Sequence, residues 1–217
     1  MIPLNTIRCC DCLNGMREIP DKSIDLVITD PPYGIGFDGK TTTDHNGWQK
    51  YERKEWDNHS PTKEYFDEIF RISKNQIIWG GNYFTDKLLI SRCWIVWYKV
   101  PYEFSLSQAE LAWTSFNTGT TVFERMTNMD RGFMNKDGKQ IHPTQKPVKL
   151  FEWIIKNYAK EGDTICDPFF GSGSCLVAAV RMGHQFIGFE KEQSYFDKAQ
   201  IRIKKAQEQG KITGWFE

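Results

Sequence analysis

The chain has 217 residues, of which 40% are hydrophobic, and its 28 basic side chains balance 28 acidic ones. That apolar content suffices for a sizeable core, so residues 1–217 are expected to form a single domain. A formal charge of zero excludes a strongly basic nucleic-acid binder, and any such contact must use a local basic patch.

The sequence also lacks the marks of a membrane or secreted protein. No apolar run approaches the roughly 20 residues that a membrane helix needs, and the start MIPLNTIRCC lacks the features of a signal peptide. Six unevenly spaced cysteines suit a reducing, cytoplasmic environment better than a disulfide framework. Cys9, Cys10 and Cys12 have no second pair at ligand spacing, so no metal site is expected.

The N-terminal part predicts a strand, a short helix and a buried strand. The first strand is expected over Thr6–Cys10, and the helix runs from Cys12 to about Ile19. The apolar run Ile24–Thr29 is typical of a buried strand. Two prolines follow and cannot continue it, so Asp30 lies where the strand gives way to a loop. In an open parallel sheet, ligands bind at such strand ends.

The stretch TDPPYGIG, residues 29–36, combines groups suited to holding an amine. The Asp30 carboxylate and the Pro31 carbonyl can each accept a hydrogen bond from a planar amino group, which turns the nitrogen lone pair outward. Tyr33 offers a flat face to a planar ring. This arrangement favours attack by an exocyclic amine on an electrophile, through orientation and pre-set electrostatics. The alternative is a proline-rich turn with a solvated aspartate and a packing tyrosine.

Two polar segments, about residues 34–60 and 126–141, are candidate insertions that contact a nucleic acid. Basic side chains interleaved with aromatic ones can grip phosphates and stack on bases. The candidate contacts are Lys40, Trp48, Lys50, Arg53 and Lys54 in the first segment, and Arg131, Lys136 and Lys139 in the second. The alternative for the first segment is a surface loop whose aromatic side chains pack locally.

The middle of the chain predicts further helices and strands of the same sheet. Ser60 followed by Pro61 is typical of a helix start, with a capping serine and a proline at the first helical position. The elements expected after this helix are a strand over Gln76–Trp79, a helix to about Ile90, a strand over Trp94–Tyr98, and an antiparallel pair over Ala109–Ser115 and Thr120–Glu124.

The C-terminal part predicts a helix, a βαβ unit and a last helix. Pro147 suits the first turn of the helix, whose start offers backbone amides to a carboxylate. In the βαβ unit, an acidic residue some twenty positions after a glycine turn is the layout that binds the ribose of a nucleoside cofactor. Its parts are a strand over Thr164–Cys166, a turn at Gly171–Gly173, a helix over Ser174–Met182, and a strand over Gln185–Phe189 that ends at Glu190. The last helix is expected over about Gln193–Gln207, with Gly210 ending it.

Four motifs, taken in order, resemble those of a known family. DPPY at 30–33, HPTQKP at 142–147, DPFFGSG at 167–173 and FIGFE at 186–190 resemble the motifs of S-adenosylmethionine-dependent amino-methyltransferases of DNA. The order, with the catalytic motif first and the cofactor motif last, looks like that of their β group, and the resemblance covers nearly the whole chain. It implies a Rossmann-like, mostly parallel seven-stranded sheet with helices on both faces, a circularly permuted motif order, and S-adenosylmethionine as the cofactor.

The resemblance also implies roles for the motif residues. Asp11 would contact the adenine of the cofactor, Asp167 its methionine ammonium, and Glu190 both ribose hydroxyls. The implied catalytic residues are Asp30, Pro31, Pro32 and Tyr33. The implied cofactor contacts are Asp11, Cys12, Asp30, His142, Thr144, Lys146, Asp167, Pro168, Phe169, Gly171, Ser172, Gly173, Glu190 and Lys191.

The substrate that the resemblance implies is an adenine in double-stranded DNA. Asp30 at the first motif position resembles the adenine-N6 members, whereas many cytosine-N4 members carry serine there. The base would swing out of the stack, lie against Tyr33, and present its amino nitrogen to the methyl group. A cytosine-N4 methyltransferase and a non-catalytic cofactor- or DNA-binding subunit are alternatives, the latter because the segment before HPTQKP, where the β group reads its target sequence, is short here. A homodimer and a restriction endonuclease counterpart are partners that the resemblance leaves open.

Overall fold

The central strand of the fold is β2 (Ile24–Thr29), the apolar run that precedes the DPPY motif. The structure, a computed structural model, describes residues 2–37, 55–99, 107–124 and 141–213. Within these ranges, β2 lies between β7 (Thr164–Asp167) and β3 (Ser73–Trp79) and is parallel to both. Five of the six β2 side chains are buried, because helices cover both faces of the sheet, and this explains the almost continuously apolar sequence.

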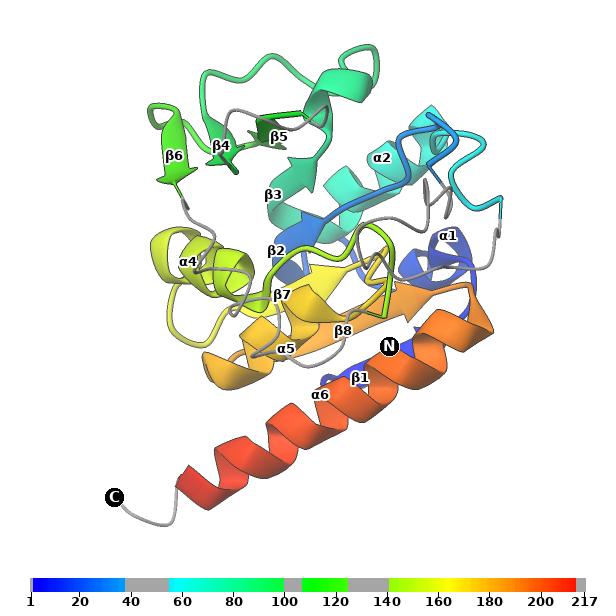
Figure 1. Cartoon of the computed structure of the whole chain (residues 1–217), viewed down its shortest axis with the longest axis vertical. Helices are drawn as coiled ribbons and strands as arrows, with labels where there is room; N and C mark the ends of the chain where they lie inside the picture. Colours follow the sequence, from blue (N-terminus) through cyan, green and yellow to red (C-terminus); the bar gives the residue numbers. More distant parts are fainter. Residues whose placement is uncertain (1, 38–54, 100–106, 125–140, 214–217) are drawn as a thin grey trace, which may run out of the picture.

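Within the described ranges, eight strands form one sheet in the order β1-β8-β7-β2-β3-β5-β4-β6 (Figure 1). The remaining strands are β1 (Thr6–Cys9), β4 (Trp94–Tyr98), β5 (Ala109–Thr114), β6 (Thr121–Glu124) and β8 (Gln185–Glu190). Five of the seven strand pairings are parallel, and the two antiparallel ones join β5 to β3 and to β4. The sheet is therefore Rossmann-like and mostly parallel, as predicted, with eight strands instead of seven.

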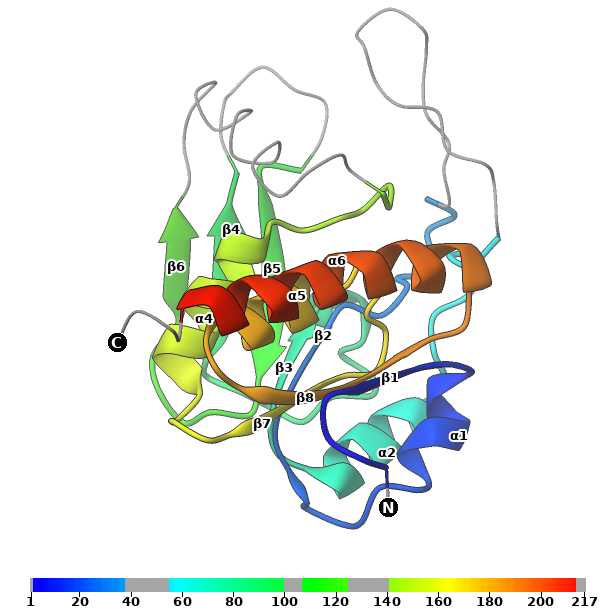
Figure 2. The ribbon, with the colours of Figure 1, turned by 90° about the horizontal axis from the view of Figure 1, so that it is seen from below.

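Helices cover both faces of this sheet, as predicted (Figure 2). One face carries α1 (Cys12–Met16) and α2 (Lys63–Ile72), and the other carries α4 (Val148–Tyr158), α5 (Ser174–Arg181) and α6 (Gln193–Thr213). Val27 of β2 packs in the core under α1 and α2, and its neighbour Leu26 packs in the core under α4, α5 and α6. Successive side chains of a strand point to opposite faces of the sheet. None of the helices in the described ranges is long and apolar enough to cross a lipid bilayer.

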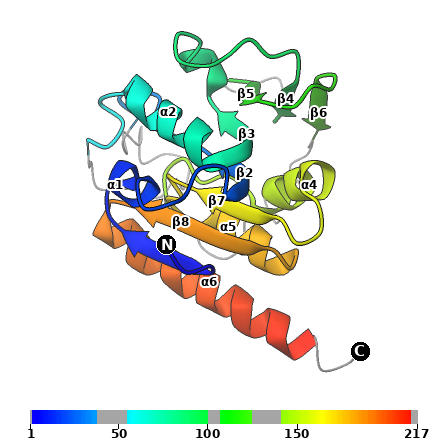
Figure 3. The same cartoon turned by 180° about the vertical axis from the view of Figure 1, so that it is seen from behind.

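The parallel strands β1, β8, β7 and β2 are neighbours, so the loops after them leave the same edge of the sheet. β1 is the edge strand next to β8, and Figure 3 shows it beside α6. Asp11 follows β1, Asp30 follows β2, and Asp167 and Glu190 are the last residues of β7 and β8. The carboxyl ends of parallel strands are where open α/β sheets bind ligands.

Two predictions for the middle of the chain are wrong. β5 and β6 do not form an antiparallel pair, because β5 inserts between β3 and β4 and leaves only the outer edge of β4 to β6. The helix expected up to Ile90 is replaced by one 3-10 turn, η1 (Gly81–Tyr83), and further turns. Leu89 and Ile90 are exposed, so a helix there would have no apolar stripe to bury against the sheet.

Three helix boundaries also differ from the prediction. α1 ends at Met16 and not at about Ile19. α2 begins at Lys63, after the N-cap Thr62, and not at Pro61 after a capping Ser60. α6 continues to Thr213, past Gly210. Gly210 does not take the left-handed conformation with which a glycine usually ends a helix, so it is a helical residue here.

Candidate active site

Asp30 lies where β2 ends, and each of its carboxylate oxygens has a hydrogen-bond donor. The Tyr33 hydroxyl donates to Oδ1 at 2.7 Å, and the Lys146 ammonium donates to Oδ2. The same ammonium lies 3.3 Å from the Tyr33 oxygen. Lys146 comes from the segment just before α4, whose N-cap is Pro147. The DPPY and HPTQKP motifs therefore meet at a single carboxylate.

Four charged side chains of alternating sign, Lys99, Glu110, Lys146 and Asp30, form what we call the charge row. Lys146 Nζ lies 3.1 Å from Glu110 Oε2, and the other oxygen of Glu110 pairs with Lys99. The Lys146 side chain is only 5% exposed, against 22% for Asp30 and 24% for Glu110. The Lys146 ammonium also lies 5.2 Å from the centre of the Trp79 ring, within range of a cation–π interaction.

The charge row holds Lys146 as a cation and Glu110 as an anion. Burial alone would lower the pKa of Lys146, but Asp30 and Glu110 raise it well above its usual value. Burial would raise the pKa of Glu110, but Lys146 and Lys99 outweigh this and hold that pKa at about 2. At Asp30 burial wins over Lys146, and the pKa is raised. Lys146 is therefore a buried cation shared between two carboxylates.

The Tyr33 ring lies in an aromatic setting that the GGNY stretch after β3 makes possible. It stacks on Tyr83 with a centroid distance of 4.7 Å and an angle of 14° between the ring planes. Gly80 has a φ of +68°, and a Cβ at this position would lie 2.1 Å from the Tyr33 ring. Glycine is therefore required at position 80 both for its backbone conformation and for the close approach of Tyr33.

Asp57 fastens the loop that follows Tyr33. Its carboxylate accepts hydrogen bonds from the backbone N–H groups of Gly34, at 2.9 Å, and Phe37, at 2.8 Å. Its backbone carbonyl accepts a third from Gly36 at 2.9 Å. Asp57 is 2% exposed, so its buried carboxylate is satisfied by backbone donors of the loop. This contact holds Asp57 against residues 34–37, directly after the DPPY motif.

Asp167 ends β7, next to the strand that carries Asp30. The Thr29 hydroxyl donates to its Oδ1 at 2.9 Å, and the Phe169 N–H donates to the same oxygen at 3.2 Å. Burial raises the pKa of Asp167 to about 7, in spite of these two donors. A positively charged ligand group at this carboxylate would offset the cost of burying its charge.

Glu190 ends β8 and accepts hydrogen bonds from the glycine turn. The Gly171 N–H donates to Oε2 at 3.0 Å and the Glu192 N–H donates to Oε1 at 2.7 Å. Burial raises the pKa of Glu190, although both donors oppose it. Gly173, with a φ of +73°, is the N-cap of α5, and the Ser172 hydroxyl lies 3.1 Å from that of Ser174.

His142, the first residue of HPTQKP, packs over this turn. Its ring lies between Trp56, at a centroid distance of 4.9 Å, and Tyr195, at 4.3 Å. The Thr144 hydroxyl lies 3.1 Å from Nδ1, and a Cβ at Gly171 would lie 3.6 Å from the ring. Burial, and then the charge of Lys146, lower the pKa of His142 to about 3, so the imidazole is neutral at physiological pH.

Asp11 lies at the neighbouring strand end and caps α1 by accepting a hydrogen bond from the Leu13 N–H at 2.9 Å. Its other oxygen accepts from the Tyr65 hydroxyl at 2.9 Å. The Tyr65 ring lies 6.0 Å from that of Phe169, so an aromatic pair flanks the space beside Asp11. Cys12 is buried in the core under α1.

The described residues thus bring three groups of sequence-predicted side chains to one edge of the sheet: the DPPY loop, the HPTQKP segment, and the glycine turn with Glu190. Pro168 and Lys191 follow Asp167 and Glu190 directly in the chain. The predicted nucleic-acid contacts, Lys40, Trp48, Lys50, Arg53, Lys54, Arg131, Lys136 and Lys139, lie outside the described residues.

Sequence reasoning missed Glu110 and Asp57 as members of this site. Glu110 stands inside the strand sequence AELAWT, for which only a strand was predicted, without a role for the glutamate. A glutamate in a half-buried strand needs a partner, and this was the available signal. Asp57 had no comparable signal, because its three bonds go to backbone N–H groups about twenty residues earlier in the chain.

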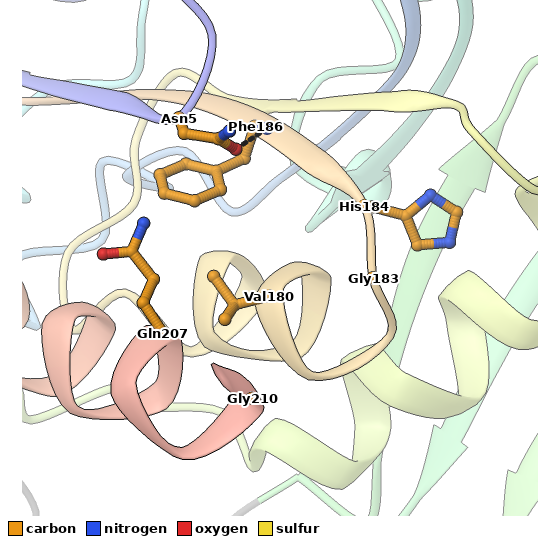
Figure 4. Close-up of a pocket in the computed structure, with 7 residues that line it drawn as sticks. All are labelled: Asn5, Val180, Gly183, His184, Phe186, Gln207 and Gly210. Carbon is orange, nitrogen blue, oxygen red and sulfur yellow. Dashed lines mark hydrogen bonds between the residues drawn. The ribbon is translucent and has the colours of Figure 1, made fainter. Parts of the chain in front are cut away.

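A separate surface cavity of about 390 Å³ lies near the start of β8, away from this edge (Figure 4). It is lined by Asn5, Val180, Gly183, His184, Phe186, Gln207 and Gly210. The Asn5 side chain accepts a hydrogen bond from the Phe186 N–H at 3.3 Å. The lining contains no carboxylate, whereas the strand ends described above bring several together, and we therefore assign the candidate active site to those strand ends.

Comparisons with known proteins agree with the motifs. A family model described as DNA methylase matches residues 52–201. The Type II methyltransferase M.HinfI of Haemophilus influenzae is 30% identical to this chain over an alignment covering 93% of the chain and 68% of that protein. The crystal structure of the M1.HpyAVI–SAM complex matches with a TM-score of 0.59 and 20% identity, covering 91% of this chain and 98% of that one. The PvuII DNA methyltransferase, which is cytosine-N4-specific, matches with the same TM-score at 15% identity, covering 91% and 85%.

Proposed function

Because the chain belongs to the N6/N4 family of DNA methylases, we propose that it transfers a methyl group from S-adenosylmethionine to the exocyclic N6 of an adenine in double-stranded DNA. The observation that carries the proposal is the hydrogen bond between Thr29 and Asp167, 2.9 Å long. It joins the strand that presents DPPY to the strand that presents DPFFGSG. An amine held at the first motif would therefore lie beside a cofactor held at the second.

The groups at the strand ends fit this cofactor by their chemistry. Asp167 is a buried carboxylate with a pKa raised to about 7, which a ligand ammonium would relieve. Glu190 is a half-buried carboxylate and can accept hydrogen bonds from both hydroxyls of a ribose. Asp11 would accept from the adenine amino group beside Phe169. When bound, the cofactor supplies an electrophilic methyl group on a sulfonium.

The DPPY loop would orient the amine for this transfer. Asp30 and the Pro31 carbonyl would each accept a hydrogen bond from one N–H group of the amine, so that the nitrogen lone pair points at the methyl carbon. The target base leaves the DNA stack at a cost of a few kcal/mol and lies against Tyr33. The nitrogen would bond to the methyl carbon while the carbon–sulfur bond breaks, and the sulfur would keep the electron pair of that bond. The nitrogen then loses a proton to water.

Adenine is proposed because Asp30 is the first residue of the DPPY motif. Many cytosine-N4 enzymes carry serine at this position. The fold does not decide between the bases, since the cytosine-N4-specific PvuII enzyme shares it. The DNA itself would run along the segments 34–60 and 126–141, with the whole chain acting as one methyltransferase domain. The hydrogen bonds of Asp57 to Gly34 and Phe37 support this, because they join described parts of the first segment to the DPPY loop.

The proposal is tested with isotope-labelled S-adenosylmethionine and unmodified duplex DNA, followed by digestion to nucleosides and mass spectrometry. The expected product is labelled N6-methyladenine. Labelled N4-methylcytosine would overturn the choice of base while keeping the reaction. Absence of label in DNA, with cofactor binding intact, would overturn the proposed activity in favour of a non-catalytic subunit.

A further inference from the structure

We propose that Glu110 is a positioning residue that draws the Lys146 ammonium away from Asp30 when the amino group of the target base enters. The inference rests on the proposed methyl transfer and concerns how the acceptor for the amine becomes available. It starts from a conflict in the geometry: the carboxylate proposed to hold the amine already holds a lysine.

The conflict is direct because both oxygens of Asp30 are engaged. Tyr33 occupies Oδ1 and Lys146 occupies Oδ2. A carboxylate paired with an ammonium is a weaker acceptor for a neutral amine, because its charge is compensated. The amine nitrogen also becomes positive as it takes the methyl group, and a cation beside it opposes that change. Lys146 therefore has to move off Asp30 for the reaction to proceed.

A buried ammonium cannot leave its partner without another anion within reach. The Lys146 side chain is 5% exposed, so water does not offer that alternative. Glu110 Oε2 does, since it already lies 3.1 Å from Lys146 Nζ. The Trp79 ring, 5.2 Å from the ammonium, would support the cation through the shift. A small movement of the lysine along the charge row thus exchanges Asp30 for Glu110.

Lys99 sets the balance of this exchange. Lys99 pairs with the other carboxylate oxygen of Glu110 and helps to keep Glu110 ionised. Because Lys99 also compensates part of the negative charge of Glu110, the attraction between Glu110 and Lys146 stays moderate. Without the Glu110 charge, Asp30 would be the one carboxylate left beside Lys146 among the described residues. The lysine would then stay on the catalytic carboxylate and block it.

Mutations of the two partners of the Glu110–Lys146 ion pair are therefore predicted to change the rate of methyl transfer in opposite directions. In single-turnover methyl transfer at saturating cofactor and DNA, Glu110→Gln should lower the rate by about 30-fold, because Lys146 is trapped on Asp30. Adding Lys146→Met to that variant should raise the rate again by about fivefold or more, because the trapped cation is gone. An ion pair that only stabilises the fold would instead leave the rate of the folded protein nearly unchanged in both variants.

The controls use the chain's own residues. Glu152 is also a carboxylate held between two cations, Lys149 at 2.5 Å and Arg181 at 3.3 Å, but it lies on α4 outside the charge row. Glu152→Gln should therefore change the rate by less than about twofold. Glu110→Asp keeps the charge and should recover most of the rate lost in Glu110→Gln. Circular dichroism and thermal unfolding verify that each variant is folded, and calorimetric titration with S-adenosylmethionine sets the saturating concentration for each.

The outcomes separate this inference from the proposed function. A double variant that is as slow as, or slower than, Glu110→Gln contradicts the inference alone, as does an equal loss in Glu110→Asp and Glu110→Gln. A wild-type protein that places no methyl group on DNA contradicts the proposed function, and the inference falls with it. Recovery of rate on removing Lys146 from the Glu110→Gln variant supports both.

Discussion

Two pairs of carboxylates lie at the same edge of the sheet, and they differ in what balances their charge. Asp167 and Glu190 accept hydrogen bonds from backbone N–H groups and a hydroxyl, and burial raises the pKa of both. Asp30 and Glu110 instead share the ammonium of Lys146. The first pair suits a ligand that brings a positive charge and hydroxyl groups. The second pair already holds a cation and must release it to accept a neutral amine.

This difference implies that the site has two separable halves. The half formed by β1, β8 and β7 would bind the cofactor, and the half formed by β2, β3 and β5 would hold the target amine. Changes in one half should then affect one quantity and spare the other. Each prediction below tests whether that separation holds.

The largest effect is expected for Asp30→Ala. The rate of methyl transfer at saturating cofactor should fall by about 1,000-fold, because the amine loses its anionic acceptor. The measurement is single-turnover transfer of labelled methyl groups to DNA. Asp86→Ala, which removes an exposed aspartate paired with its neighbour Lys87, is the matched control and should change the rate by less than about twofold.

Asp167→Asn should act on the other half. The affinity for S-adenosylmethionine should fall by about 100-fold, because a charge-assisted contact to the ligand ammonium is lost. Calorimetric titration measures this, and transfer at saturating cofactor should be reduced much less than in Asp30→Ala. An unchanged affinity would mean that Asp167 is only a structural partner of Thr29.

The raised pKa of Asp167, about 7, also predicts a dependence on pH. Protonation removes the charge that binds the ammonium, so cofactor affinity should weaken by up to about tenfold per pH unit below 7. The unliganded protein should respond oppositely. A carboxyl whose pKa is raised on folding favours the folded state at low pH, and this contribution is lost as the pH rises through about 7.

Thermal unfolding and cofactor titration between pH 6 and 8 measure the two trends. Asp167→Asn should flatten both, because an amide does not titrate. Trends that persist unchanged in this variant would assign them to another group and remove the contrast between the two pairs of carboxylates.

A smaller effect is expected for Gly80→Ala. The added Cβ would lie 2.1 Å from the Tyr33 ring and the residue would keep a strained φ, so stability should fall by about 1–3 kcal/mol. Displacement of Tyr33 should also lower the transfer rate by about tenfold. Gly36→Ala carries the same kind of strain, with a φ of +69°, but its Cβ would meet nothing within 4 Å. Equal losses of rate in both variants would argue against a role for the Tyr33 contact.

The strands and the motif loops could be predicted from the sequence because their signals are local. The apolar run of β2 followed by two prolines predicts a strand that ends at Asp30, and the structure has that strand. The glycine turn and Glu190 lie within one βαβ unit, so their hydrogen bond follows from short-range geometry. All eight segments proposed as strands form strands, with small changes at their ends.

The charge row could not be predicted, because it depends on the order of strands in the sheet. Glu110 reaches Lys146 only because β5 inserts between β3 and β4, and hydrophobic periodicity carries no information on that order. The Tyr33 contact with Tyr83 was missed for a related reason. The stretch after β3 was assigned to a helix, whereas Gly80 in a left-handed conformation turns the chain back over the DPPY loop.

The separation of the two halves is tested most directly by the affinity of Asp30→Ala for S-adenosylmethionine, measured by calorimetry beside the wild type. The account predicts a dissociation constant within about threefold of the wild-type value, although methyl transfer is lost. A fall in affinity comparable to that of Asp167→Asn would contradict it, because Asp30 would then belong to the cofactor site and not to the site of the target amine.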